Sequence, residues 1–470
     1  MIRNGKKKAI SCALVAAMSV GLAACGTTSY DFKVSYDGIK TGDVSSKVSV
    51  HDPSILKADG EYYIFGSHMS AAKSSDLLNW EKVADGYSKK NPVYGQIYDV
   101  ADEAFAYSGS KNSLIKTDDK QVHVWAPDVI YNETTGLYYM YYCTTSTWNA
   151  SNLCYGTSTT PEGPYEWQGA LIYSGFNRKT ISGTDVLDYV DEDYAYKNYI
   201  KGAQYNYEDY PNAIDPTVFY DADGRMWMVY GSWSGGIFLL EIDKTTGLVI
   251  HPEADKANNV DPYYGKRLLG GGHISIEGPY IMYDEASGYY YLFVSYGALT
   301  SNGGYQVRVF RSKTVDGEYV DMNGKYPEKS AQHQNFGLKL TGNYKLPSLE
   351  KAYMATGHNS AFVDDDGRMY LVYHTRFNDN GEGHSPRVHQ MLVNEDGWPC
   401  ELPYQTQGET VNKDGYDTDD IIGRYYVINQ GTAIDSKIAN PVILYLEKNG
   451  KVKGEKSEGI WECKDGSYYM

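Results

Sequence analysis

The sequence has too little positive charge and too few cysteines for several classes of protein. Its 60 acidic residues outnumber 43 basic ones and give a net charge of -17, which repels phosphate backbones and anionic membrane surfaces. We therefore expect no nucleic-acid partner. Of the six cysteines, four follow residue 25, and their spacing is not that of a metal-thiolate centre. Cys143 and Cys154 are close enough in sequence for a hairpin, so a disulfide between them and two free thiols both remain open.

Long apolar runs are missing beyond the N-terminus. Arg3 and three lysines precede a short apolar stretch that ends in Leu22-Ala23-Ala24-Cys25, which is typical of a secretory signal and too short for an ordinary membrane-spanning helix. The ending resembles the lipobox of bacterial lipoproteins, which implies lipidation of Cys25. We expect a signal peptide over residues 1–25, a flexible linker over 26–45, and a protein that is lipid-anchored outside the cytoplasm or secreted, with the anchor as its only membrane contact.

Long helical periodicity is also absent, whereas one hairpin pattern recurs five times. Each copy has a polar residue, usually followed by Pro, then a short apolar strand, a glycine turn and an aromatic strand, in keeping with the 47 tyrosines of the chain. The copies start at Asp52, Ala126, Asp215, Glu277 and His358. The turn glycines supply the positive φ that tight hairpins need. Five such units predict an all-β, five-bladed β-propeller over residues 46–404. A β-sandwich is the alternative, but it has no reason to repeat one hairpin five times.

The last part of the chain has a different pattern. Residues 405–470 are β-rich, with turns such as Asn449-Gly450 and Asp465-Gly466. We expect a small C-terminal module resembling a β-barrel. Tyr468-Tyr469-Met470 is typical of the start of a strand that has no partner, and a shortened module and an incomplete sequence are both compatible with this ending.

Three of the five repeat starts are acidic. If each copy begins the innermost strand of its blade, then Asp52, the Ala126–Asp128 segment, Asp215, Glu277 and His358 lie at equivalent heights beside the axis. Carboxylates held so close raise each other's pKa, and paired carboxylates are what glycosidic bond cleavage requires. A single Asp-Pro is more often a turn starter. The coincidence in three repeats is therefore what indicates a catalytic site.

Several motifs of this region carry a family resemblance that covers about residues 48–404. They are His51-Asp52-Pro53-Ser54, Trp125-Ala126-Pro127-Asp128, Asn212-Ala213-Ile214-Asp215-Pro216, Ile276-Glu277-Gly278-Pro279, Gly357-His358-Asn359-Ser360 and Arg387-Val388-His389-Gln390-Met391. The sequence resembles glycoside hydrolase family 43, and within it the endo-α-1,5-L-arabinanases. This implies that Asp52 is the general base, Glu277 the general acid, and Asp215 the group that raises the pKa of the acid and orients it. The family inverts anomeric configuration, which predicts that the carboxyls of Asp52 and Glu277 lie about 6.5 to 9.5 Å apart.

The resemblance also implies an ion and a substrate surface. His358 corresponds to a histidine that helps to hold a central ion, usually calcium with a water-rich shell, although a buried histidine is more often a core residue and calcium prefers oxygen ligands. Candidate substrate-binding residues are Trp125, Asp128, Trp148, Ser232 and Trp233. The tryptophans suit either sugar stacking or the core, and Asp128 suits either a sugar contact or support of the second blade. We expect the Tyr173–Tyr210 segment to shape the binding surface.

The function expected from these residues is endo-hydrolysis of arabinan by a monomer. Exo-acting α-L-arabinofuranosidase or β-xylosidase activity of the same family is the first alternative. Retaining fructosidases are disfavoured because they carry Arg-Asp-Pro and Glu-Cys where this chain has Ile214-Asp215-Pro216 and Glu277-Gly278. A surface lipoprotein that binds glycans without cleaving them is the remaining alternative, and the presence of all three carboxylates counts against it.

Overall fold

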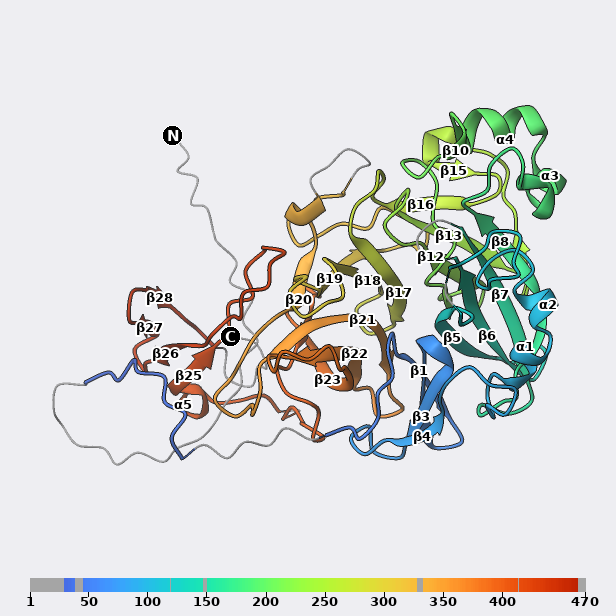
Figure 1. Cartoon of the computed structure of the whole chain (residues 1–470). Helices are drawn as coiled ribbons and strands as arrows, with labels where there is room; N and C mark the ends of the chain where they lie inside the picture. The colour runs from blue at the N-terminus through green and yellow to red at the C-terminus, as the bar shows by residue number, and fades with distance from the viewer. Residues whose placement is uncertain are drawn as a thin grey trace, which may run out of the picture.

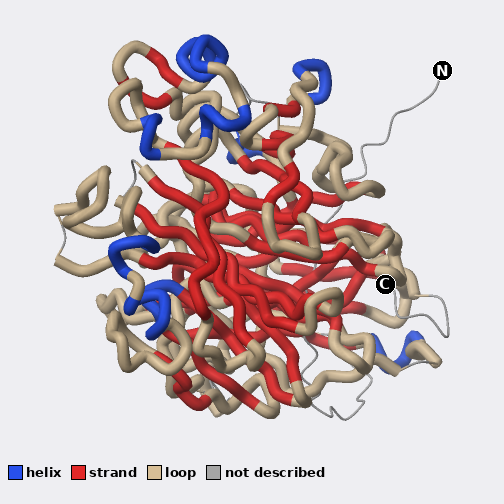
Figure 2. The backbone as a smooth tube through the Cα atoms, turned by 90° about the vertical axis from the view of Figure 1, so that its right-hand side faces the viewer, coloured by secondary structure: helices blue, strands red, loops and turns tan. Residues whose placement is uncertain are grey.

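The computed structural model describes residues 29–38, 45–118, 120–146, 150–327, 333–412 and 414–463. The expected signal peptide, Cys25 and Trp148 lie outside these residues. Strands occupy the centre of the molecule and short helices lie at its periphery (Figure 2). In the described ranges, none of the helices has the length and apolar character needed to cross a bilayer.

Five antiparallel sheets follow one another along the chain (Figure 1). The first consists of β1 (Ser54–Ala58), β2 (Glu61–Gly66), β3 (Ser70–Ser74) and β4 (Glu81–Ala84). The second consists of β5 (Val124–Asn132), β6 (Leu137–Thr145), β7 (Ser151–Ser158) and β8 (Glu166–Ser174). The third consists of β11 (Thr217–Tyr220), β12 (Met226–Tyr230), β13 (Ile237–Ile242) and β16 (Gly265–Leu269), with β14 (Val249–Ile250) and β15 (Val260–Asp261) added at its edge.

The last two of the five sheets have the same meander order. The fourth consists of β17 (Ile276–Asp284), β18 (Tyr289–Tyr296), β19 (Gln306–Ser312) and β20 (Leu338–Thr341). The fifth consists of β21 (Tyr353–Val363), β22 (Met369–Phe377), β23 (Ser385–Val393) and β24 (Pro399–Glu401). The predicted turn glycines Gly60, Gly136, Gly224, Gly288 and Gly367 all have positive φ and join the first two strands of their sheets.

The first strands of these sheets contact one another in a closed ring. β1 contacts β5, β5 contacts β11, β11 contacts β17, β17 contacts β21, and β21 returns to β1. A hydrophobic cluster fills each of the five gaps between neighbouring sheets, including the gap between the fifth and the first. Sheets arranged radially around an axis form a β-propeller, and the prediction of an all-β propeller is confirmed.

Cys143 and Cys154 lie on neighbouring strands of the second sheet but are free thiols. Cys143 pairs with Leu153, whereas Cys154 pairs with Tyr142. Because side chains alternate along a strand, the two sulfurs lie on opposite faces, one in the cluster shared with the third sheet and the other in the cluster shared with the first. A disulfide between them is therefore excluded.

The Tyr173–Tyr210 segment contains short elements between the second and third sheets. They are η2 (Ile181–Gly183), α3 (Val186–Tyr189), α4 (Glu192–Asn198), β9 (Ile200–Lys201) and β10 (Gln204–Tyr205). Tyr199 and Tyr205 are buried together with Tyr263 and Tyr264, which come from the loop before β16. These tyrosines therefore build a core for the insertion. The other short helices are η1 (Ser67–Met69), α1 (Gly95–Asp99), α2 (Ala101–Ala104), η3 (Lys256–Asn258) and η4 (His333–Asn335).

A separate sheet follows the ring near the C-terminus. It contains β25 (Gly423–Val427), β26 (Val442–Leu446), β27 (Lys451–Gly454) and β28 (Glu458–Ile460), and is preceded by α5 (Thr418–Ile421). Arg308 of the fourth sheet donates a hydrogen bond of 2.5 Å to the carbonyl oxygen of Thr432. Residues 29–38 contact this last sheet, because the Asp31 N–H donates to the Tyr445 hydroxyl at 3.0 Å and Arg424 donates to the Lys33 carbonyl at 3.0 Å. Residues 29–38, which are part of the expected linker, therefore lie against this sheet.

Candidate active site

Five residues around the ring share an uncommon backbone conformation. Asp52, Ala126, Asp215, Gly278 and His358 have φ values of 55°, 40°, 56°, 56° and 46°. Each lies in the first strand of its sheet or just before it. Positive φ in a residue other than glycine costs about 1 to 3 kcal/mol and persists where the surrounding structure enforces it, often at functional sites. Four of the five residues are not glycine, and the recurrence of this strain in four of the five sheets points to the ring axis as the site of chemistry.

Glu277 is not at the position that the repeat predicted. Trp125, Glu277 and Gly357 are each the last paired residue before a bulge in which two residues oppose one. Gly278, with its positive φ, is the true counterpart of Asp52 and Asp215, so the predicted alignment of Glu277 was wrong by one residue. The reason is that Pro279 follows Gly278, whereas in the first and third sheets the proline follows the aspartate directly.

Asp52 is held by one hydroxyl and faces three imidazoles. Ser67 Oγ donates to its Oδ2 at 2.5 Å. His358 Nδ1 is 3.1 Å from Oδ1, His51 Nε2 is 3.4 Å away, and His374 Nδ1 is 3.7 Å away. Burial favours the neutral acid, but the facing imidazoles, His358 first, outweigh it and hold the pKa of Asp52 well below its ordinary value. Asp52 is therefore a carboxylate at neutral pH.

Glu277 is buried between donors from two loops. Tyr305 donates its hydroxyl proton to Oε1 at 2.6 Å. Trp233 Nε1 donates to Oε2 at 2.6 Å, and Ser232 Oγ lies 3.3 Å from the same oxygen. Burial raises the pKa of Glu277 above its ordinary value although the Tyr305 hydrogen bond opposes this. The environment thus favours a carboxyl group that keeps its proton to higher pH than a free glutamate.

Asp215 lies beside Glu277 and titrates with it. The Gly278 N–H donates to Asp215 Oδ2 at 3.1 Å. Burial, and then the charges of Glu277 and Asp52, raise the pKa of Asp215 to about 7, while His358 acts in the opposite direction. Burial lowers the pKa of His358, but the charges of Asp52, Asp215 and Glu277 outweigh it and raise that pKa above its ordinary value. Asp52, whose pKa is lowered, can therefore act as a base. Asp215 and Glu277, whose pKa values are raised, can hold a proton as an acid does.

Two protein-family models match this chain. The model for glycosyl hydrolases family 43 matches residues 44–209 and 191–399, and the model for a C-terminal lipocalin-like domain matches residues 403–470. The chain belongs to glycosyl hydrolases family 43. The family 43 match accordingly spans the five sheets of the ring, and the lipocalin-like match spans the sheet from β25 to β28.

Relatives of this family 43 chain include named arabinanases. An extracellular endo-α-(1→5)-L-arabinanase of Thermotoga petrophila is 39% identical over 429 residues, which cover 88% of this chain and 83% of that protein. The extracellular endo-α-(1→5)-L-arabinanase 2 of Bacillus subtilis is 36% identical over 444 residues, covering 89% and 83%. The crystal structure of an endo-1,5-α-L-arabinanase from Thermotoga petrophila superimposes with a TM-score of 0.74 at 38% identity and covers 91% of this chain and 88% of its own.

The family 43 site offers few free ligands to a calcium ion. His358 turns Nδ1 to Asp52, and its backbone N–H donates to Ser295 Oγ at 2.7 Å, which leaves Nε2 as its one nitrogen for an ion. Both oxygens of Glu277 and one oxygen of Asp215 already accept hydrogen bonds. Calcium takes six to eight oxygen ligands. These residues therefore fit calcium only as one imidazole contact within a shell of water.

The other candidate residues have different positions in the family 43 fold. Trp233 and Ser232 contact Glu277, so they hold the carboxyl group whether or not they also touch sugar. Trp125 is half-buried and packs against the cluster between the second and third sheets. Asp128 is buried and accepts hydrogen bonds from Ser54 Oγ and, at 2.6 Å, from the Val218 N–H. This ties the first three sheets together and favours the supporting role for Asp128 over a sugar contact.

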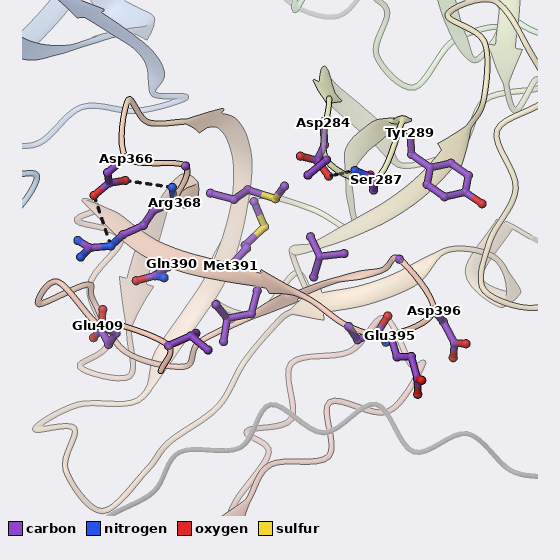
Figure 3. Close-up of a pocket in the computed structure, with 18 of the residues that line it drawn as sticks. Asp284, Ser287, Tyr289, Asp366, Arg368, Gln390, Met391, Glu395, Asp396 and Glu409 are labelled. Carbon is purple, nitrogen blue, oxygen red and sulfur yellow. Dashed lines mark hydrogen bonds and ion pairs between the residues drawn. The ribbon is translucent and has the colours of Figure 1, made fainter. Parts of the chain in front are cut away.

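A hollow of about 830 Å³ lies away from these carboxylates. It is formed by hairpin turns of the fourth and fifth sheets and by the Glu409 segment, and it is lined by Asp284, Asp366, Arg368 and Gln390 among others (Figure 3). Asp284 is at the opposite end of β17 from Glu277, roughly 20 Å along an extended strand. We place the chemistry at the carboxylates instead, because charged groups with mutually shifted pKa values converge there.

Sequence reasoning missed the groups that control the carboxyls. Ser67 and Tyr305 come from loops between the second and third strands of their sheets, outside the repeated motif. His374 lies in β22 and pairs with Gly357. The one available signal was His51, which directly precedes Asp52 in the first motif.

Proposed function

We propose that this protein is an extracellular endo-α-1,5-L-arabinanase that hydrolyses internal bonds of arabinan. The observation that carries the proposal is the buried set of Asp52, Asp215 and Glu277, in which the pKa of Asp52 is lowered and those of the other two are raised. The arabinanase names of relatives at 36% and 39% identity over most of the chain supply the substrate and the endo mode.

The roles of the three carboxyls follow from their protonation. Glu277 donates its proton to the glycosidic oxygen as the bond from that oxygen to the anomeric carbon breaks. Asp52 takes a proton from the water whose oxygen forms the new bond to that carbon from the opposite face, which inverts the anomeric configuration. Asp215 keeps Glu277 protonated through its charge and orients it through the Gly278 N–H that lies between them.

We further propose five blades, each built on one sheet of the ring, and a C-terminal module formed by residues 405–470. The protein acts as a monomer. The resemblance of the sequence around Cys25 to a lipobox supports a lipid anchor on an exported protein, and an extracellular location agrees with the names of the relatives. A calcium ion held by His358 and water remains part of the proposal, and none of the steps above passes through it.

The product profile on debranched arabinan tests the proposal. Protein that begins at residue 26 should lower the viscosity rapidly and release a ladder of oligosaccharides. Glu277→Ala and Asp52→Asn should abolish both effects while the fold, followed by circular dichroism, is retained. Release of monosaccharide alone, or of sugar from nitrophenyl glycosides but not from arabinan, would indicate an exo-acting enzyme; an extracellular exo-arabinofuranosidase of Cellvibrio japonicus is 27% identical over 369 residues. Binding of arabinan without any hydrolysis would contradict the enzymatic role.

A further inference from the structure

Half of the ten histidines of the chain gather around Asp52. The ring of His51 lies 4.5 Å from that of His374, 4.6 Å from that of His384 and 5.9 Å from that of His68, measured between ring centroids. His358, the fifth, pairs with Asp52 from within the ring of sheets. The proposed function uses Asp52 as the base and assigns His358 to a calcium ion, but it gives no task to His51, His374 or His384.

Three of these side chains have the separations of metal ligands. One potential ligand atom from each of His51, Asp52 and His374 lies within 4.8 Å of the other two. His51 Nε2 is 3.4 Å from Asp52 Oδ1, yet this nitrogen makes no hydrogen bond. Two ligands that each lie about 2.0 to 2.1 Å from a tetrahedral ion are roughly 3.4 Å apart. The His51 and Asp52 atoms therefore have the spacing of ligands that share an ion.

His374 supplies an independent observation. Its side chain is fully buried. Its Nδ1 atom accepts the backbone N–H of Asp52 at 3.3 Å, whereas its Nε2 atom has no hydrogen-bond partner among the described residues. Buried polar atoms are nearly always satisfied, so an unpaired one needs an explanation such as an unseen ion or water. A cation that the His374 imidazole shares with the unpaired His51 nitrogen and the Asp52 carboxylate would supply such an explanation.

We propose that His51, Asp52 and His374 form a binding site for a divalent cation of the zinc type, and that its occupation inhibits the enzyme by engaging Asp52. Two imidazoles and one carboxylate with a fourth position left open are a common zinc ligand set, whereas calcium favours oxygen ligands. The site is thus distinct in ligands and in metal from a water-held calcium at His358. Binding does not depend on the proposed function; the inhibition rests on the role of Asp52 as the base.

Isothermal titration of the metal-free protein, beginning at residue 26, with zinc chloride tests the site. We expect one zinc per chain. His51→Gln and His374→Gln should each weaken zinc binding at least about tenfold, since even the loss of a group that only supports a ligand costs about 10 to 100-fold. His251→Gln is the matched control, because this half-buried histidine contacts Tyr263 next to the insertion and should bind zinc as the parent does. Asp52→Asn, which removes the third ligand, gives a further binding readout if either histidine variant fails to fold.

Activity on debranched arabinan in the same metal-free buffer separates the two proposals. Zinc should inhibit the parent protein with a midpoint equal to that of binding, and calcium at the same concentration should not inhibit. Zinc binding that is unchanged in the variants at positions 51, 52 and 374 would overturn the site, and bound zinc without inhibition would overturn the regulatory role. Absence of arabinan cleavage both before any metal is added and after calcium is added would instead contradict the proposed function and leave the binding result standing.

Discussion

The hydrogen bond from Tyr305 to Glu277 should set the alkaline limit of activity. The Tyr305 hydroxyl donates to Oε1 at 2.6 Å within a fully buried site, and it is the strongest of the contacts that lower the pKa of Glu277. A hydrogen bond to a charged group contributes about 1.5 to 3 kcal/mol, and one pKa unit corresponds to about 1.4 kcal/mol. Tyr305→Phe keeps the ring but removes the donor, so we expect it to raise the pKa of Glu277 by about one to two units.

The sign of the effect on activity follows from the role of the acid. Glu277 acts only when protonated, so activity falls as pH rises through its pKa, and a higher pKa moves this fall to higher pH. The pH dependence of kcat/KM on debranched arabinan reports the groups of the free enzyme. The alkaline limb of Tyr305→Phe should therefore lie about one to two pH units above that of the parent, while the acid limb, set by Asp52, stays in place.

Tyr319→Phe is the matched control for Tyr305→Phe. Tyr319 is fully buried in the hydrophobic cluster between the third and fourth sheets. Its hydroxyl donates to the carbonyl oxygen of Val315 at 2.8 Å and makes no contact with the three carboxyls. Its pH profile should match that of the parent. An alkaline limb of Tyr305→Phe that stays in place or moves to lower pH would refute the assignment of Glu277 as the acid whose pKa this hydroxyl controls.

Three other substitutions have defined outcomes. Asp52→Asn should lower kcat on arabinan by about 10² to 10⁴-fold, the usual contribution of a general base, while circular dichroism shows that the fold is retained; a loss below tenfold would argue against this base. Gly278→Ala should lower stability by about 1 to 3 kcal/mol, because φ is 56° and the added Cβ would meet the His358 ring at 3.1 Å; unaltered urea unfolding would contradict this. Asp128→Ala should also cost about 1 to 3 kcal/mol by leaving the buried Val218 N–H unpaired, and if it instead lowered only arabinan affinity, Asp128 would be a sugar ligand.

The repeated hairpins made most of the fold predictable from sequence. Each glycine turn and its flanking strands depend on local residue chemistry, so Gly60, Gly136, Gly224, Gly288 and Gly367 located the first two strands of every sheet. Their number and equal pattern also predicted that the first strands would meet around an axis. Local patterns were sufficient here because a propeller repeats one unit.

The details of the site depend on contacts that no local pattern contains. Tyr305 reaches Glu277 from a loop that lies 28 residues further along the chain, and His374 reaches Asp52 only because the fifth sheet closes against the first. The one-residue error at Glu277 arose because a bulge changes the register without changing the hydrophobic pattern. Strand register likewise places Cys143 and Cys154 on opposite faces of their sheet, and their spacing in the sequence did not reveal this.

The most direct test of the account is the leaving-group dependence of Glu277→Gln. This variant should cleave arabinan about 10² to 10⁴-fold more slowly than the parent, because the departing sugar oxygen needs a proton. It should cleave a dinitrophenyl α-arabino-oligosaccharide at nearly the parental rate, since that leaving group departs without protonation. Equal losses on both substrates would contradict the role of Glu277 as the proton donor, and with it the assignment of acid and base on which the proposed mechanism rests.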